Sequence, residues 1–154
     1  PWGEIPAPVF EHIRLDTFGH ALRYAISDIR QVIQIRDLHS PQSLIHVHTY
    51  DYVWPWDSPF RLGPLRFGPW IKPWFDAVGL VALDAQRVVT HWLIDQCARE
   101  LKALVSQHPN MVLIDSRGTL KTRAQWNDEI HPSAAGFERI ARQCWKPRLT
   151  DVLR

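Results

Sequence analysis

An aspartate stands three residues ahead of a histidine in the segment NDEIHPSAAGFERIA, residues 127–141. A single turn of chain between Asp128 and His131 would bring the carboxylate to one imidazole nitrogen. That contact fixes the imidazole tautomer, raises the basicity of the other nitrogen and stabilises the imidazolium that forms on proton uptake. Pro132 suits a first helical position and Ser133 a helix cap, so the backbone after the histidine should be fixed. The pattern predicts a general base, although the spacing by itself also fits a surface Asp–His pair beside a cap.

The residues around this pair resemble the carboxy-terminal motif of the SGNH (GDSL) hydrolases, in which Asp-x-x-His-Pro is followed by a glycine and a helix. Three upstream segments are similar, in the same order, to one bacterial branch of that family: HTYDYVWP (48–55), GPWIKP (68–73) and LIDSRGTL (113–120). The resemblance covers most of residues 44–141. It implies a serine ester hydrolase acting on a small-molecule ester, with His131 as the general base and Asp128 as the acid that orients it.

The other catalytic groups of that family have no counterpart in this sequence. Family members carry the nucleophile in a Gly-Asp-Ser motif near the amino end, and a glycine and an asparagine from later motifs complete the oxyanion hole. Neither Gly-Asp-Ser nor Gly-x-Asn-Asp occurs here. Ser27 lies in a predicted helix, Ser40 precedes a proline and Ser116 follows a predicted strand, so none has the family's context. We therefore expect residues 1–154 to be the carboxy-terminal portion of a single SGNH hydrolase-like domain, with the nucleophile outside this chain.

The elements that must position the dyad follow from hydrophobic periodicity. Residues 1–10, with three prolines, are expected to form an extended lead-in. Apolar spacing of three and four predicts helices over residues 17–36, 84–106 and 133–144, and short apolar runs predict strands at 44–48 and 111–115. This alternation indicates an α/β fold with a parallel sheet.

Two strands are too few for a parallel sheet, which is normally buried on both faces and several strands wide. We therefore expect a three-layer αβα parallel sheet of the SGNH or flavodoxin-like type that is incomplete in this chain. A missing amino-terminal segment or a second chain would supply the remaining strands.

Residues 49–79 form a long loop with five prolines and four of the eight tryptophans. A loop of this length in a compact domain is usually functional. Trp54 and Trp70 could build an apolar wall for an acyl chain or a sugar ring, or they could simply bury the loop itself. His48, Tyr50 and Asp51 lie at the carboxyl end of the predicted strand 44–48. Open α/β sheets place their sites at that end, so these residues are predicted to help bind substrate near the base.

Two other hypotheses compete with the esterase. His46 and His48 would face the same way on a strand, and with Asp51 they could form a zinc hydrolase site. The chain could also be a non-catalytic binding module, a split subunit or a pseudoenzyme that uses its tryptophan-rich surface. The esterase reading itself requires neither metal nor cofactor.

The composition of the chain limits the classes of partner that we expect it to bind. The chain has 154 residues, a net charge of +2 and 22% charged residues, with both signs interspersed. Because no run of five Lys or Arg residues occurs, neither nucleic acid nor an anionic membrane is an expected partner. No apolar stretch is long enough to span a bilayer, and the first residues lack a signal-peptide pattern. Localisation stays undecided, with a soluble cytoplasmic protein slightly favoured.

Overall fold

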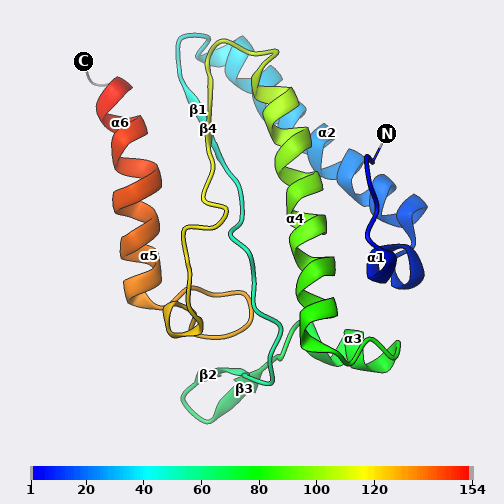
Figure 1. Cartoon of the computed structure of the whole chain (residues 1–154). Coiled ribbons are helices and arrows are strands. Elements are labelled where there is room, and N and C mark those ends of the chain that lie inside the picture. Colours follow the sequence, from blue (N-terminus) through cyan, green and yellow to red (C-terminus); the bar gives the residue numbers. More distant parts are fainter. Residues whose placement is uncertain (1, 153–154) are drawn as a thin grey trace.

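The computed structural model describes residues 2–152 of the chain, apart from the side chains of residues 60–62 and 151–152. It is a mixed structure of helices and short strands (Figure 1). In chain order the elements are α1 (Ala7–His12), α2 (Leu15–His39), β1 (Ile45–His48), β2 (Phe60–Leu62), β3 (Leu65–Phe67), α3 (Lys72–Ala77), α4 (Leu83–Val105), β4 (Met111–Ile114), η1 (Arg123–Gln125), α5 (Ala134–Ile140), η2 (Ala141–Trp145) and α6 (Lys146–Val152).

Strands β1 and β4 form a two-stranded parallel sheet, in which Ile45 is opposite Met111 and His48 is opposite Ile114. The parallel pairing confirms the α/β character that the sequence predicts. Alternate residues of a strand face opposite sides of a sheet. Accordingly Ile45 and Val47 pack with α2 and α4, whereas His46 and His48 turn to the Trp145 side. Figure 1 shows the sheet between α4 on one side and α5 and α6 on the other.

The long helices α2 and α4 pack together through the apolar stripe that each carries on one face. Leu22, Ile26 and Ile33 recur at helical spacing on α2 and are buried with Leu104 of α4 and Met111 of β4. Full burial of one such side chain contributes about 1.5–3 kcal/mol. The same spacing in the sequence predicts both helices, and their observed bounds differ from the predicted ones by one to three residues.

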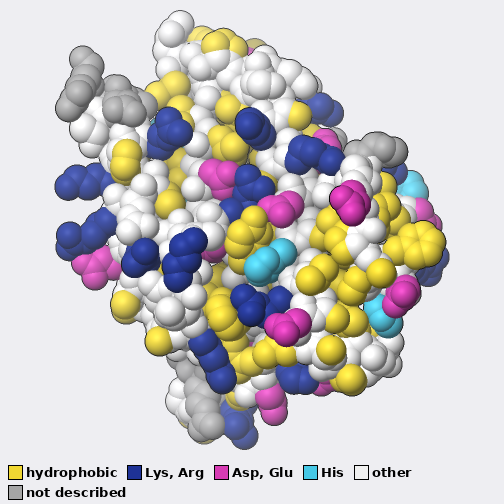
Figure 2. All heavy atoms as spheres, in the orientation of Figure 1, with side chains coloured by type: hydrophobic (Ala, Val, Ile, Leu, Met, Phe, Trp, Pro, Cys, Tyr) yellow, Lys and Arg dark blue, Asp and Glu magenta, His cyan; other side chains and the backbone are white. Residues whose placement is uncertain are grey.

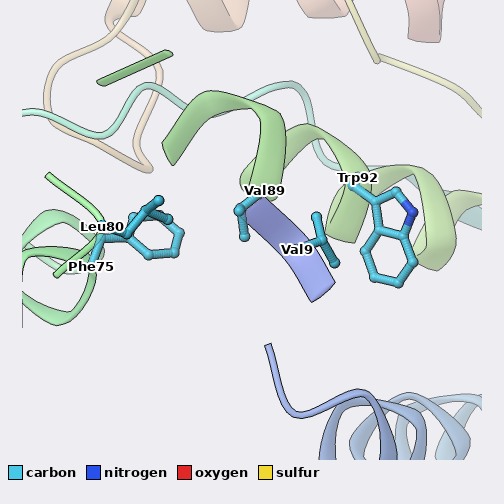
Figure 3. Close-up of a cluster of buried hydrophobic side chains, with 5 residues drawn as sticks. All are labelled: Val9, Phe75, Leu80, Val89 and Trp92. Carbon is cyan, nitrogen blue, oxygen red and sulfur yellow. The ribbon is translucent and has the colours of Figure 1, made fainter. Parts of the chain in front are cut away.

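A second cluster of buried side chains joins α1 and α3 to α4. Val9, Phe75, Leu80, Val89 and Trp92 form it, and Figure 3 shows Val9 next to the α4 side chains Val89 and Trp92. The expected extended lead-in is therefore wrong in part, because α1 begins at Ala7. Proline fits the first turn of a helix, where its missing N–H costs no hydrogen bond, and this turn contains Pro8.

The long segment 49–79 contains more regular structure than the sequence predicts. Strands β2 and β3 form a short antiparallel hairpin, and α3 follows directly after it. Figure 1 shows this hairpin and α3 at the same end of the molecule as the loops that precede α5. A loop without regular structure is thus the wrong description of residues 60–77. Each of these elements is only three to six residues long, which is too short to leave a periodic pattern.

The third predicted helix begins at Ala134 and continues without a break through the π-helical segment η2 into α6. Charged side chains of both signs are interspersed with apolar ones on the face seen in Figure 2, in agreement with the nearly balanced composition. Within residues 2–152, none of the helices combines the length and the apolar character that crossing a membrane requires.

Candidate active site

The dyad lies in a tight loop between η1 and α5. Trp126 and Pro132 form an isolated antiparallel bridge at its base, and the Asn127 N–H donates to the His131 carbonyl at 2.7 Å. Pro132 thus precedes the helix rather than occupying its first position, so that prediction is wrong. Ser133 is the N-cap, and its Oγ accepts from the Gly136 N–H at 3.3 Å, as predicted.

Gly136 is required by the contact between α5 and η1. A Cβ at this position would lie 2.2 Å from the Gln125 carbonyl oxygen, far inside van der Waals contact. The Ser133 N–H also donates to that carbonyl, at 2.9 Å. The helix that follows the dyad is therefore held directly against the turn that precedes it.

The Asp128 side chain is completely buried, whereas 46% of the His131 side chain is exposed. Asp128 Oδ1 accepts the backbone N–H groups of Ile130 at 2.9 Å and His131 at 2.8 Å. Its Oδ2 lies 2.8 Å from Nδ1 of His131. The carboxylate therefore holds both the backbone and the ring of the histidine, which is the contact that the three-residue spacing predicts.

This geometry suits proton transfer. A neutral imidazole whose Nδ1–H donates to Asp128 has its acceptor lone pair on Nε2, and the carboxylate stabilises the imidazolium that forms when Nε2 takes a proton. Because the ring is half exposed while its partner is buried, His131 can meet a substrate without losing its orienting group. The pair can act as a general base and, after protonation, as a general acid.

Tyr50 reinforces the same loop from the end of β1. Its hydroxyl donates to the Ile130 carbonyl, one residue before His131. Burial and the nearby Asp128 carboxylate both raise the pKa of Tyr50, so its hydroxyl stays protonated and remains a donor at neutral pH. The Tyr50 ring lies 6.4 Å from the ring of Trp126, between centroids.

Asp51 connects the end of β1 to the loop after β4. Its carboxylate, 3% exposed, accepts the backbone N–H groups of Tyr52 at 2.7 Å, Gly118 at 2.6 Å and Leu120 at 2.7 Å. These three donors occupy the Asp51 oxygens, so its contribution to the site is to fix two neighbouring loops. Its proposed contact with substrate remains a prediction.

A cavity of about 460 Å³ adjoins the dyad loop, which is within the usual size range of small-molecule sites. Three of the residues predicted to bind substrate, His48, Tyr50 and Asp51, line it together with Trp126 and Pro132, which close the dyad loop. The lining residues are His48, Tyr50, Asp51, Trp126, Pro132, Phe137, Ile140, Ala141 and Trp145. Burial lowers the pKa of His48 and favours its neutral form, against the opposing effect of Asp51 and Asp115.

Trp54 and Trp70, also predicted to bind substrate, are not among the residues that line this cavity. The Arg87 guanidinium lies 4.3 Å from the centroid of the Trp54 ring, which gives that ring a packing partner. Trp70 is 40% exposed and is held through its backbone. The structure thus places both tryptophans around the site but outside its cavity.

Glu129 was not predicted from the sequence, yet it is fully buried next to the dyad. Its Oε2 accepts the backbone N–H groups of Trp70 and of Ile71, the latter at 2.7 Å, and its Oε1 accepts that of Lys72 at 2.7 Å. Glu129 therefore ties the tryptophan-rich segment to the loop that carries His131. The only signal in the sequence is the acid beside Asp128, and no spacing rule connects it with residues 70–72.

A polar network surrounds the carboxyl ends of the two strands. The Arg117 guanidinium lies between Asp95, at 2.7 Å, and Asp115, at 2.6 Å. Its hydrogen bond to Asp115 lowers the pKa of that carboxyl to about 2. The Tyr52 hydroxyl donates to Asp95 at 2.7 Å, and burial together with this bond raises the pKa of Tyr52 to about 12.

His46 and His48 face the same side of the sheet, as predicted, but together with Asp51 they do not form a group that could hold a metal ion. The ring centroids of His46 and His48 lie 6.3 and 5.6 Å from that of Trp145, and the Asp51 oxygens accept backbone N–H groups. Among the described residues, no group of three or more His, Cys, Asp or Glu side chains could hold a metal ion.

The three serines considered as nucleophiles lie in structural positions. Ser116 is fully buried and donates to the Thr49 carbonyl at 2.8 Å. Ser27 is on α2, and Ser40 follows the end of that helix and bonds with Ser43. Comparisons of the chain with protein-family models, curated proteins and solved structures found no match.

Proposed function

We propose that this chain carries the acid–base part of a serine ester hydrolase of the SGNH type. His131 is the general base, Asp128 orients it, and the nucleophilic serine comes from residues outside these 154. The observation that supports this most is the buried Asp128 carboxylate holding Nδ1 of a half-exposed imidazole.

In this mechanism Nε2 of His131 takes the proton of the serine hydroxyl while the serine oxygen attacks the ester carbonyl carbon. The protonated ring then gives that proton to the departing alcohol, which leaves an acyl-enzyme. Water, deprotonated by the same nitrogen, then attacks the acyl carbon, and the ring returns that proton to the serine oxygen as the acid leaves. Asp128 keeps its negative charge throughout and stabilises the imidazolium.

The position of the dyad also supports the proposal. His131 follows a loop that is tied to the carboxyl ends of β1 and β4 through Tyr50 and Asp51. Open α/β sheets bind ligands at that end of their strands. The cavity of about 460 Å³ adjoins the dyad loop through Trp126 and Pro132, although His131 itself does not line it. Its walls, which include Phe137 and Trp145, offer an apolar surface for an acyl or alcohol group.

We further infer the finer architecture, a three-layer αβα parallel sheet that more strands complete. Helices already cover both faces of the β1–β4 pair, through Leu104 on one face and Trp145 on the other. A two-stranded parallel sheet between helix layers is narrower than such sheets usually are. Further parallel strands would extend the β1–β4 pair sideways.

The test uses the full-length natural protein that contains this chain. We expect it to hydrolyse p-nitrophenyl acetate and to react with a fluorophosphonate that labels activated serines. His131→Ala should lower kcat by about 10²–10⁴-fold and slow the labelling, because the serine loses its base. His39→Ala, on the exposed end of α2, is the matched control and should leave both rates unchanged.

Ester cleavage at the wild-type rate by a folded His131→Ala protein would contradict the proposed base. Absence of both turnover and labelling in the wild-type protein would instead favour the non-catalytic alternatives, a binding module or a pseudoenzyme. Circular dichroism of each variant separates loss of the base from loss of the fold.

A further inference from the structure

A second cavity, of about 560 Å³, lies between α2, α4 and the amino-terminal segment. It combines an apolar floor with a basic rim and shares no lining residue with the cavity beside the dyad. The lining residues are Trp2, Leu15, Asp16, Gly19, His20, Leu22, Arg23, Ile26, Arg30, Arg99 and Glu100.

The floor of this cavity is apolar and well supported. Leu22 and Ile26, exposed by 9% and 7%, belong to the buried stripe of α2. The Trp2 ring packs 5.6 Å from Phe18 and 5.7 Å from Trp92, between centroids. Gly19 allows Trp2 to approach, because a Cβ there would lie 3.1 Å from the indole.

The rim is formed by arginines. Arg23 and Arg30 are seven residues apart on α2, so they lie on the same face, about 10 Å apart along the helix axis. Arg99 faces them from α4. Among the described residues, Arg23 and Arg30 form no ion pair. Arg99 lies 3.8 Å from Glu100, and its guanidinium is 5.9 Å from the centroid of the Trp2 ring.

The charge of the rim favours an anion. The cavity is lined by three arginines and two acidic residues, Asp16 and Glu100, so the arginines exceed the acids by one. Guanidinium groups bind carboxylate and phosphate oxygens through paired hydrogen bonds. An anion between Arg23 and Arg30 would therefore find donors that no side chain of the described structure occupies.

We propose that this cavity binds an amphipathic anion, a single hydrocarbon chain with a carboxylate or phosphate head. The chain would lie on Leu22, Ile26 and Trp2, which removes apolar surface from water. The head would bind Arg23 and Arg30, with Arg99 completing the rim. This site is independent of the dyad, so it does not depend on the proposed esterase.

The experiment titrates the ¹⁵N-labelled full-length natural protein that contains this chain with decyl phosphate below its micelle concentration. We expect shifts at the Gly19 amide and the Trp2 indole N–H. Decanoate should bind at the same residues, which would show that the head can be either anion. Decyltrimethylammonium, with the same tail and the opposite charge, should bind at least about tenfold more weakly, and so should inorganic phosphate, which has no tail.

Three variants test the role of the arginine charges. The Arg23→Gln/Arg30→Gln protein should bind decyl phosphate at least about tenfold more weakly. The Arg23→Lys/Arg30→Lys protein, which keeps the positive charges, should bind more tightly than the double glutamine protein but less tightly than wild type. Lys102→Gln, an exposed cation on α4 outside the cavity, should leave the affinity unchanged. Both arginines are exposed, so the double variant is expected to fold.

Four results would overturn the proposal. Equal affinity for the decyl cation would show simple hydrophobic adsorption, and undiminished binding by the Arg23→Gln/Arg30→Gln protein would remove the assigned head site. Shifts confined to residues outside the cavity would place the ligand elsewhere. The last measurement uses vesicles with and without phosphatidylserine. If the protein bound only the anionic vesicles and had no affinity for the monomeric ligands, the arginines would bind a membrane surface and the cavity would not be a ligand site.

Discussion

Replacing Glu129 with glutamine tests whether one buried carboxylate holds the tryptophan-rich segment against the dyad loop. The substitution keeps the size of the side chain and removes its charge. In the wild-type protein the two carboxylate oxygens accept three backbone N–H groups, from Trp70, Ile71 and Lys72. A glutamine has one acceptor oxygen and one amino group at the same positions.

The magnitude follows from those three bonds. If the amide oxygen takes the place of Oε2, it keeps the donors Trp70 and Ile71, but the amide nitrogen then faces the N–H of Lys72. A hydrogen bond to a charged group contributes about 1.5–3 kcal/mol, and a buried donor left without a partner costs about 1–3 kcal/mol. A neutral side chain avoids the desolvation cost of a buried charge, which offsets part of the loss. We therefore expect the free energy of unfolding to fall by about 2–4 kcal/mol.

Urea unfolding followed by tryptophan fluorescence measures this change, and hydrogen exchange at the amides of residues 70–72 locates it. Exchange there should accelerate in the Glu129→Gln protein. Glu138→Gln is the control, because the Glu138 side chain is 60% exposed and its surface pair with Arg142 should contribute about 0.5 kcal/mol or less. A change within 0.5 kcal/mol of wild type, with unaltered exchange at residues 70–72, would refute the proposed anchoring.

Further predictions concern the dyad, the strand ends and α5. In the full-length protein, Asp128→Asn should lower kcat for p-nitrophenyl acetate by about 10²–10⁴-fold, because the amide no longer fixes the His131 tautomer. The folded-state pKa of Asp115, about 2, lies below its unfolded value. Its stabilisation is therefore present above about pH 4 and lost as pH falls towards 2. Asp115→Asn should cost about 1 kcal/mol in urea unfolding at pH 7, since the side chain is 41% exposed, and progressively less as pH falls through about 2. Gly136→Ala should lower the free energy of unfolding by about 1–3 kcal/mol in the same assay, because its Cβ would lie too close to the Gln125 carbonyl oxygen.

The parts of this fold that the sequence predicts are those governed by local repetition. Helix α2 carries Leu22, Ile26 and Ile33 on one stripe, and such a stripe forms wherever the rest of the core lies. The Asp128–His131 contact is similarly local, since both residues belong to one turn of chain. The Ser133 cap follows from the same short-range chemistry.

The contacts that the sequence does not predict join segments far apart in the chain. Glu129 binds Trp70 and Lys72 across 59 and 57 residues, and Asp51 binds Leu120 across 69. In each case the acceptor is a side chain and the donor a backbone N–H, which every residue except proline has. No residue type marks the donor partner, so neither periodicity nor composition can identify it.

Those long-range bonds account for how the dyad can be fixed on loops rather than on strands. Asp51, Asp128 and Glu129 are almost or fully buried, and each accepts at least two backbone N–H groups. A buried carboxylate that lost those donors would lie uncompensated in a medium of low dielectric, which costs several kcal/mol. Each of these loops is therefore held in the arrangement in which its backbone N–H groups donate to the buried carboxylate. Because Asp128 is fixed in this way and binds the His131 ring, the orientation of the ring is established before a substrate binds.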